Sequence, residues 1–266
     1  MPLVFRWPGP YQARMRTPIS PILAVAAAVA CLAAAIAFYA PARSDSGDQP
    51  VLVELFTSQG CYSCPPADRL LGRLADKEGV VALAFHVNYW DRLGWPDPFA
   101  TEWGTERQRR YGETVSEGRI YTPQLVIDGQ THEVGSNERQ VHYALARAAR
   151  QARPVTPMLA WAGPDRVRIT VPAVAEAAGA DIWLARFDRR RETEVLRGEN
   201  GGRRLTYHRI VREQTAVGRY DGRAGTLEAQ VAPGDPGNWG IAVVVQQPGP
   251  GRVWGAALLT APKPDA

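Results

Sequence analysis

Residues 51–66 read VLVELFTSQGCYSCPP, an apolar run that ends in a turn and leads into two cysteines. The first six residues are apolar at all but one position, which is the pattern of a strand covered on both faces. Two prolines follow the second cysteine. Proline is tolerated in the first turn of a helix, because the N–H groups there have no partner inside the helix. The stretch therefore predicts a buried strand, a tight turn that carries the cysteines, and a helix.

Cys61 and Cys64 form a Cys-x-x-Cys pair between a strand and a helix, an arrangement typical of thioredoxin-like proteins. A thiolate is the nucleophile in thiol-disulfide exchange, and the positive end of a helix dipole stabilises that anion. We expect Cys61 to be the exposed attacking thiol. Cys64 is expected to be the resolving thiol, which closes on Cys61 and releases a mixed-disulfide partner. Because a residue before proline is disfavoured in helical space, Cys64 is predicted to cap the helix.

Two other interpretations of the cysteine pair stay open. Exported proteins use such pairs as permanent structural disulfides. Two thiolates together with His86 could also hold Cu(I), which prefers soft ligands. Zinc is not expected, because a second pair of ligands is absent from the sequence. His86 lies in an apolar run, residues 80–87, and is predicted to be a core histidine. We therefore predict no metal and no cofactor.

Strand and helix patterns alternate up to about residue 153. A helix is expected from the two prolines to about Lys77, a buried strand over 80–87 and a helix around 106–111. Residues 121–130 predict a strand followed by an Asp-Gly hairpin turn, and a helix capped by Ser136 or Asn137 follows. This order predicts an α/β domain over residues 43–153, with helices on the faces of a sheet.

Beyond Pro154 no long helix is evident, and short β-type runs alternate with turn residues. The expected strands are 158–161, 167–171, 182–187, 209–213, 227–231, 241–245 and 253–259. Several short strands with frequent turns are typical of a β-sandwich. The fold class predicted is thus a thioredoxin-like α/β domain followed by a β-rich, sandwich-like domain over 154–266.

The first 42 residues have the pattern of an export signal. Three arginines precede an uncharged apolar run over 22–40, which ends in small residues, and cleavage is expected before Arg43. An uncleaved membrane anchor is the alternative, because the run is close to the about 20 residues that a bilayer requires. In both cases the remaining chain is predicted to lie outside the cytoplasm, in the periplasm or secreted. Contact with a membrane is expected only through this segment, which would anchor the chain to the inner membrane if uncleaved.

The charge balance gives no support to a nucleic-acid partner. The chain has 31 basic and 27 acidic residues, and three of the arginines lie in the expected leader, which contains no acid. The rest is therefore nearly neutral. Basic patches such as 189–191 stand beside glutamates and predict a solvated face.

Four segments together, VELFTSQGCYSCPPAD, FHVNYWDRLGWPDPF, RQRRYG and YTPQLVIDG, resemble the secreted domain of unknown function 1223 family, within the thioredoxin-like superfamily. The resemblance covers roughly residues 50–260 and implies a thioredoxin-like first domain, without a settled activity. It also implies a cis proline opposite the cysteines, a position that Thr122-Pro123 fits. A buried acid that accepts the proton of the resolving cysteine is the further implication, and Glu54 is the candidate. A Glu54 that reaches solvent at a strand edge is the alternative.

The leading hypothesis is an exported protein that exchanges thiols through Cys61 and Cys64, with Glu54, Thr122 and Pro123 as supporting residues. Its partners would be protein thiols or disulfides. The aromatic segment 88–104 is either packed on the sheet or forms a groove that meets those partners. The alternatives are a non-enzymatic binding protein with a structural disulfide and a Cu(I) carrier. The chain is thus a candidate oxidoreductase rather than an assigned enzyme.

Overall fold

The computed structural model describes residues 49–261, and the expected leader with its cleavage site lies outside them. Strands and helices alternate in the first half. In chain order they are β1 (Val51–Thr57), α2 (Pro65–Ala75), β2 (Val80–His86), a 3-10 turn (Asp91–Leu93), α3 (Glu102–Val115), β3 (Gln124–Ile127), β4 (Thr131–Val134) and α4 (Glu138–Ala148). No helix in this described part is long and apolar enough to cross a bilayer.

The second half is made of strands. They are β5 (Met158–Trp161), β6 (Arg166–Val171), β7 (Asp181–Val195), β8 (Arg203–Arg219), β9 (Gly225–Gln230), β10 (Trp239–Gln246) and β11 (Val253–Thr260), with a 3-10 turn at Ala175–Ala177. Each of the seven runs predicted from the sequence falls on a strand, although the run 227–231 extends one residue past the end of β9. However, β7 and β8 are much longer than expected, because their exposed, charge-rich ends hide the apolar pattern.

Eight strands form one sheet, in the order β11-β10-β7-β8-β2-β1-β3-β4. β1 pairs parallel to β2 along its whole length and antiparallel to β3. β8 joins the edge of β2 at Ala84 and Ile210, so strands from both halves of the chain share this sheet. Residues Asp45–Ala266 accordingly form a single compact unit, and the sheet continues across the boundary expected near residue 153.

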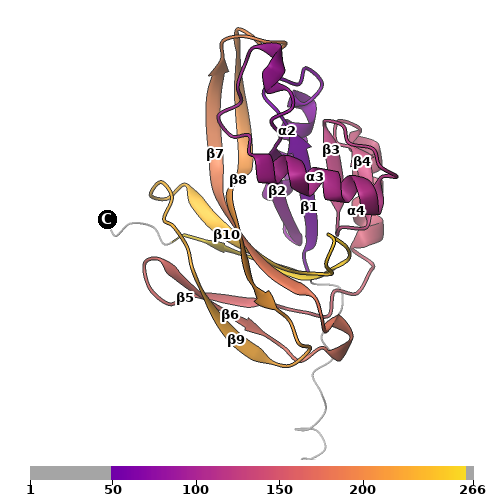
Figure 1. Ribbon diagram of the computed structural model, residues 1–266, viewed down its shortest axis with the longest axis vertical. Helices are drawn as coiled ribbons and strands as arrows, with labels where there is room; N and C mark the ends of the chain where they lie inside the picture. The colour runs from indigo at the N-terminus through magenta and orange to yellow at the C-terminus, as the bar shows by residue number, and fades with distance from the viewer. Residues whose placement is uncertain (1–48, 262–266) are drawn as a thin grey trace, which may run out of the picture. The chain divides into compact units, whose positions relative to one another are not determined.

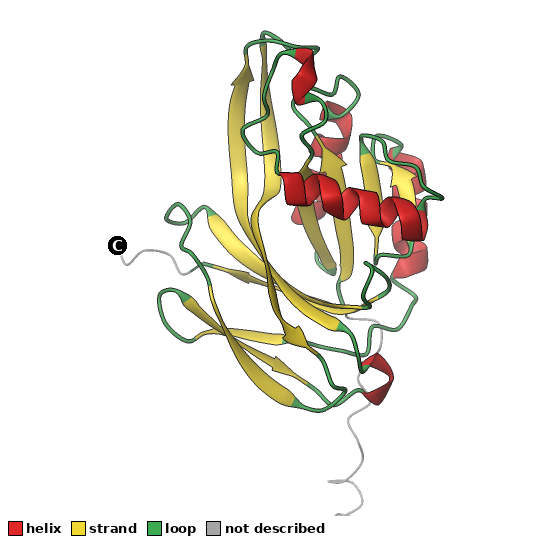
Figure 2. Cartoon of the chain, viewed as in Figure 1, coloured by secondary structure: helices red, strands yellow, loops and turns green. Residues whose placement is uncertain are grey.

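Helices cover both faces of the β1–β4 part of the sheet. Val53 and Leu55 of β1 pack with α2 and α4 in one core cluster, whereas Leu52 and Phe56 pack with Tyr111 of α3 in another. This division follows from the two-residue period of a strand. Figure 2 shows α3 in front of the sheet, with the other two helices behind it. The predicted mixed α/β arrangement is confirmed at this level.

A second, three-stranded sheet of order β5-β6-β9 packs against the far end of the large sheet. Its inward residues, such as Val167 and Ile169 of β6, share a core cluster with Ile182 of β7 and Val243 of β10. Figure 1 shows this small sheet below β10. The β-rich half therefore has two facing sheets, one of which belongs equally to the first half.

Candidate functional site

Cys61 and Cys64 are joined by a disulfide at the turn between β1 and α2, with 5.4 Å between their Cα atoms. Cys64 is the N-cap residue of α2, and Pro65 occupies the first helical position. The expectation that the proline would push Cys64 out of helical space is wrong, because its φ and ψ are −77° and −37°. The Cys64 carbonyl accepts the N–H groups of Ala67 and Asp68, which holds that residue in the first turn.

Both cysteines are buried, which corrects the prediction of an exposed Cys61. Their exposed fractions are 1% for Cys61 and 0% for Cys64, whereas Tyr62 between them is 68% exposed. The cover comes from the β7–β8 turn, residues 196–202. Asn200 Nδ2 donates to the carbonyl oxygens of Gln59 and Cys61, each at 2.9 Å. Thus a segment some 140 positions away in sequence is hydrogen-bonded to the backbone of the cysteine turn.

A second contact from the same turn fixes the residue after Cys61. The backbone N–H of Tyr62 donates to Glu199 Oε2 at 3.0 Å, and the Arg203 guanidinium lies over the Tyr62 ring. The tips of β7 and β8 lie at the end of the sheet where β1 leads into α2 (Figure 1). Three hydrogen bonds therefore join this turn to the backbone around Cys61.

Thr122-Pro123 is a cis peptide bond, as the resemblance implied, and it lies beside the cysteine turn. Ser63 Oγ is 3.4 Å from Cys61 Sγ and donates to the Thr122 carbonyl oxygen at 3.5 Å. Trp90 Nε1 donates to Thr122 Oγ1 at 2.8 Å from the other side. The structure therefore brings together four of the predicted site residues: Cys61, Cys64, Thr122 and Pro123.

Glu54 does not join them. It is fully buried, so the strand-edge alternative is wrong, and Arg107 Nε donates to Glu54 Oε1 at 2.6 Å. The Tyr111 hydroxyl donates to its other oxygen. Both partners belong to α3, on the face of β1 that points away from α2. The proton-acceptor role expected for Glu54 at Cys64 is thus contradicted, because the alternation along β1 puts its carboxylate on the opposite face.

Asp68 is the buried acid on the cysteine side, and the sequence analysis missed it. It lies four residues after Cys64, and residues i and i+4 of a helix are surface neighbours. Helical side chains also lean toward the helix N-terminus, which here is the disulfide. Thr57 Oγ1 donates to Asp68 Oδ1 at 2.8 Å, while Oδ2 has no partner among the described residues. Burial raises the pKa of Asp68 to about 7.

His86, Asp97 and Tyr207 extend this buried polar cluster. His86 Nδ1 and Asp97 Oδ2 are 2.6 Å apart, and the rings of His86 and Tyr207 meet edge to face at 4.9 Å. Burial opposes ionisation of Asp97, but the charge of His86 and hydrogen bonds from Gln59 and Phe99 hold its pKa below the usual value. His86 Nε2 and the Tyr207 hydroxyl lack partners within residues 49–261. His86 is therefore a core histidine, as predicted. Its Nδ1 pairs with Asp97, and its Nε2 is buried without a partner among the described residues.

The aromatic segment 88–104 is packed rather than laid open as a groove. Tyr89, Trp90 and Trp103, the last of these in the first turn of α3, are partly buried against the core, and Trp95 packs beside Tyr207. Trp95 Nε1 also donates to Gln59 Oε1 at 2.9 Å, in the turn just before Cys61. The segment thus contacts the turn that carries the cysteines through Gln59.

Metal binding finds no geometric support in the described part of the chain. No group of three His, Cys, Asp or Glu side chains there is arranged to hold a metal ion. His86 is paired with Asp97 and does not complete a ligand set with the two cysteines.

Comparison with known proteins assigns the family. The model of the protein family of unknown function DUF1223 matches residues 52–246, and the chain belongs to this family. A search of curated proteins finds no match.

Two solved structures share the fold. A structural-genomics protein from Agrobacterium tumefaciens is 33% identical, with a TM-score of 0.70, over 81% of this chain and 96% of its own. HBP35 of Porphyromonas gingivalis is 14% identical, with a TM-score of 0.61, over 82% of this chain and 78% of its own. At that identity the second likeness concerns the fold alone.

Proposed function

We propose that this member of the DUF1223 family is an exported thiol-disulfide exchange protein whose first half is a thioredoxin-like domain. The observation that carries the proposal is the disulfide between Cys61 and Cys64 at a strand-to-helix turn, beside the cis bond of Thr122-Pro123. A buried acid one helical turn after Cys64 and the family match are consistent with it. Export is proposed from the leader pattern alone.

Each step of the exchange can be assigned to named atoms. A thiolate of a partner dithiol attacks Cys61 Sγ, the bond between Cys61 and Cys64 breaks, and Cys64 leaves as a thiolate. Asp68 in its protonated form gives that thiolate a proton. The partner's second thiolate then attacks the partner sulfur of the mixed disulfide, and Cys61 leaves. The partner loses two electrons and the cysteine pair gains them, and reversal of these steps oxidises the pair.

Because Cys61 is buried, the proposed exchange also requires the β7–β8 turn to open. Asn200 donates to the carbonyls of Gln59 and Cys61, and Glu199 accepts from the Tyr62 N–H, so hydrogen bonds to the backbone hold the turn against the cysteine segment. A hydrogen bond contributes only about 1 kcal/mol net, so an open state that is sparsely populated is accessible. The Thr122 backbone beside Ser63 would then lie next to the partner's extended chain.

Trapping of a mixed disulfide tests the proposal. Cys64→Ser removes the resolving thiol, so a disulfide-bearing peptide attacked by Cys61 stays attached to the protein. The expected result is a stoichiometric adduct at Cys61, seen by intact mass, in the folded protein. Cys61→Ser is the matched control, because the proposal makes Cys61 the attacking thiol and Cys64 alone should form little adduct. An adduct that appears only after unfolding, or equally in both variants, argues against exchange at Cys61.

A non-enzymatic binding protein with a structural disulfide is the second candidate. The observation in its favour is the burial of both cysteines under the β7–β8 turn. It predicts that Cys61→Ser with Cys64→Ser costs 2–5 kcal/mol of stability, roughly, and leaves binding of the cellular partner intact. Loss of function without loss of folding in that double variant favours exchange instead.

A further inference from the structure

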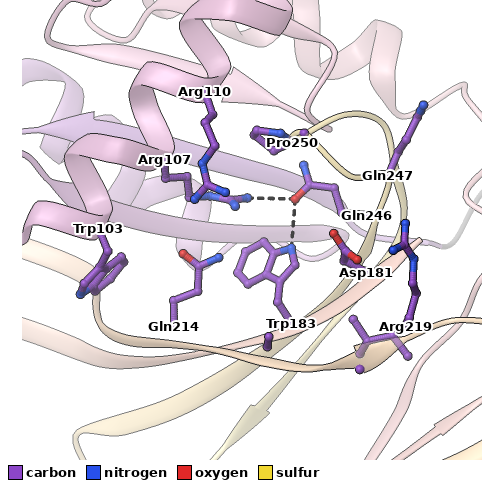
Figure 3. Close-up of a pocket in the computed structure, with 14 residues that line it drawn as sticks. Trp103, Arg107, Arg110, Asp181, Trp183, Gln214, Arg219, Gln246, Gln247 and Pro250 are labelled. Atoms are coloured by element: carbon purple, nitrogen blue, oxygen red, sulfur yellow. Dashed lines mark hydrogen bonds between the residues drawn. The ribbon is translucent and has the colours of Figure 1, made fainter. Parts of the chain in front are cut away.

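A cavity of about 510 Å³ lies on the α3 side of the large sheet and belongs to no part of the cysteine site. Its walls come from α3, β7, β8 and the segment after β10. The volume falls within the roughly 300–1,000 Å³ that is usual for small-molecule sites. Figure 3 shows its side chains, with Trp183 between Gln214 and Gln246 and with Arg107 and Arg110 above them.

Arg107 forms the innermost polar wall of this cavity. It is only 3% exposed, and its Nε donates to Glu54 at 2.6 Å while its Nη2 donates to Gln246 Oε1 at 3.0 Å. The Trp183 ring stacks 4.3 Å below its guanidinium carbon. Arg107 Nη1 has no hydrogen bond to any residue in 49–261, although the side chain lines the cavity. A rigid, buried guanidinium therefore keeps one donor nitrogen available for a ligand.

The remaining charges around the cavity favour an anion. Arg107, Arg110 and Arg219 line it, and Asp181 is the one acid among the lining residues. Glu54 neutralises Arg107 from behind, and the excess charge of the site is therefore positive. Among the described residues neither Arg110 nor Arg219 forms an ion pair, and Arg219 lies opposite Asp181 in the β7–β8 register with its Nε donating to the Gly179 carbonyl. Two exposed arginines thus lie at the cavity beside a preorganised buried one.

The apolar part of the lining favours a flat ligand. Trp103 and Trp183 present indole rings from α3 and β7, and Pro250 closes the cavity on the side of the β10–β11 loop. Trp183 is itself fixed, because its Nε1 donates to Gln246 Oε1 at 3.0 Å. Guanidinium groups bind a carboxylate through paired charge-assisted hydrogen bonds, and aromatic rings stack on its flat body.

We propose that this cavity is a binding site for a small aromatic carboxylate, with Arg107 and Arg110 on the carboxylate and Trp103 and Trp183 against the ring. Arg219 lies across the cavity and adds to its positive charge. The site is on the opposite face of the sheet from Asp68 and stands independently of thiol exchange.

Calorimetric titration of the oxidised full chain with 2-naphthoate tests this proposal. Saturable binding of one molecule per chain is expected, and 2-naphthalenemethanol and acetate should each bind at least tenfold more weakly, since one lacks the charge and the other the ring. Arg110→Gln should weaken 2-naphthoate about tenfold. Arg109→Gln is the matched control, because Arg109 lies next to it on α3 but pairs with Glu102 and Glu106 and does not line the cavity.

Three results would overturn the assignment. They are no saturable binding of 2-naphthoate by the folded chain, equal binding of the neutral alcohol, or equal loss of affinity in Arg109→Gln and Arg110→Gln. The Trp183 indole N–H signal in a ¹⁵N-labelled sample provides a second readout, and it should shift in proportion to saturation.

Discussion

At the scale of single residues, the decisive side chains around the disulfide are acids, and their positions relative to the sheet determine their roles. Glu54 and Asp68 are both buried, but the first faces α3 and the second belongs to α2. Glu54 has a full set of partners from Arg107 and Tyr111. Asp68 has one hydrogen bond, from Thr57, and an oxygen without a partner in the described structure. Of these two acids, Asp68 is therefore the one to which the proposed exchange assigns the proton of Cys64.

Asp68→Asn tests the burial of that acid through the pH dependence of stability. The pKa of Asp68 is raised to about 7, mainly by burial, with His86, Thr57 and Arg69 lowering it and Asp97 raising it. The folded state therefore binds more protons than the unfolded state between about pH 4 and 7. Stability is highest at the acid end of that window and is lost as the pH rises. Between pH 5 and 8 the wild type should lose roughly 2–3 kcal/mol more than Asp68→Asn.

Urea denaturation at the two pH values provides this measurement. Asp76→Asn is the control, because Asp76 is exposed at the C-cap of the same helix. A wild-type pH profile that coincides with that of Asp68→Asn would show that the acid titrates normally.

The substitution Glu54→Gln tests whether Glu54, rather than Asp68, takes part in thiol exchange. The substitution leaves the buried Arg107 without its counterion. Breaking a buried ion pair in this way should lower the free energy of unfolding by about 3–5 kcal/mol. The rate of thiol exchange in the folded protein should stay within a factor of two, because Glu54 faces away from α2. Glu102→Gln removes an exposed partner of Arg109 and should change stability by less than about 1 kcal/mol. A tenfold loss of exchange rate in folded Glu54→Gln would restore Glu54 as the proton acceptor.

Sequence reasoning found the cysteines and the Thr122-Pro123 bond because their chemistry depends on local motifs. It missed Asp68 because an acid in a first helical turn is ordinary helix-dipole chemistry. A signal was nevertheless present, since Asp68 precedes Leu71 by three positions and so lies on the apolar face of α2.

At the scale of elements, the β7–β8 turn is the part of the second half that is hydrogen-bonded to the cysteine turn, and the proposed exchange requires it to open. β7 and β8 run as a long hairpin beyond the edge of β2, and their tips reach the cysteine turn. The sequence predicted only the apolar inner parts of these strands. Their outer parts, such as RRRETEV, carry charges on an exposed face, and a turn containing Gly201-Gly202 gives no indication of a distant contact.

Asn200→Ala should open this cover. The substitution removes two hydrogen bonds to the carbonyls of Gln59 and Cys61, each worth about 1 kcal/mol, so reduction of the disulfide by dithiothreitol should accelerate about thirtyfold. Asn238→Ala is the matched control, because Asn238 makes a similar amide contact to Arg190 in another loop. An unchanged rate in Asn200→Ala would mean that the turn does not limit access.

At the scale of the described residues, 49–261, the large sheet joins both halves of the chain into one structure. Leu52, Phe56 and Phe85 from the first half pack with Trp183 and Val244 from the second. The sequence predicted the strands of each half of the chain, but not that β8 of the second half pairs with β2 of the first half in one sheet. A single register point between β2 and β8 leaves no local pattern, and the shift from helices to strands near residue 153 resembles a domain boundary.

A fragment ending at residue 153 is therefore expected not to fold alone. It would expose the core cluster that α3 and β7 share, and Arg107 would lose Gln246 and Trp183. Circular dichroism and amide exchange should show a chain without protected β1 and β2, whereas residues 43–266 should melt in one cooperative transition. A stable, protected fragment would instead support two independent domains.

The reduction potential of the Cys61–Cys64 disulfide tests the central claim most directly. Equilibration of the folded protein in glutathione buffers, followed by alkylation and intact mass, measures it. Exchange predicts a potential above about −300 mV, within reach of cellular dithiols, and a Cys61 thiol that alkylates before Cys64. A pair that stays oxidised below that potential would identify a structural bridge and contradict the account.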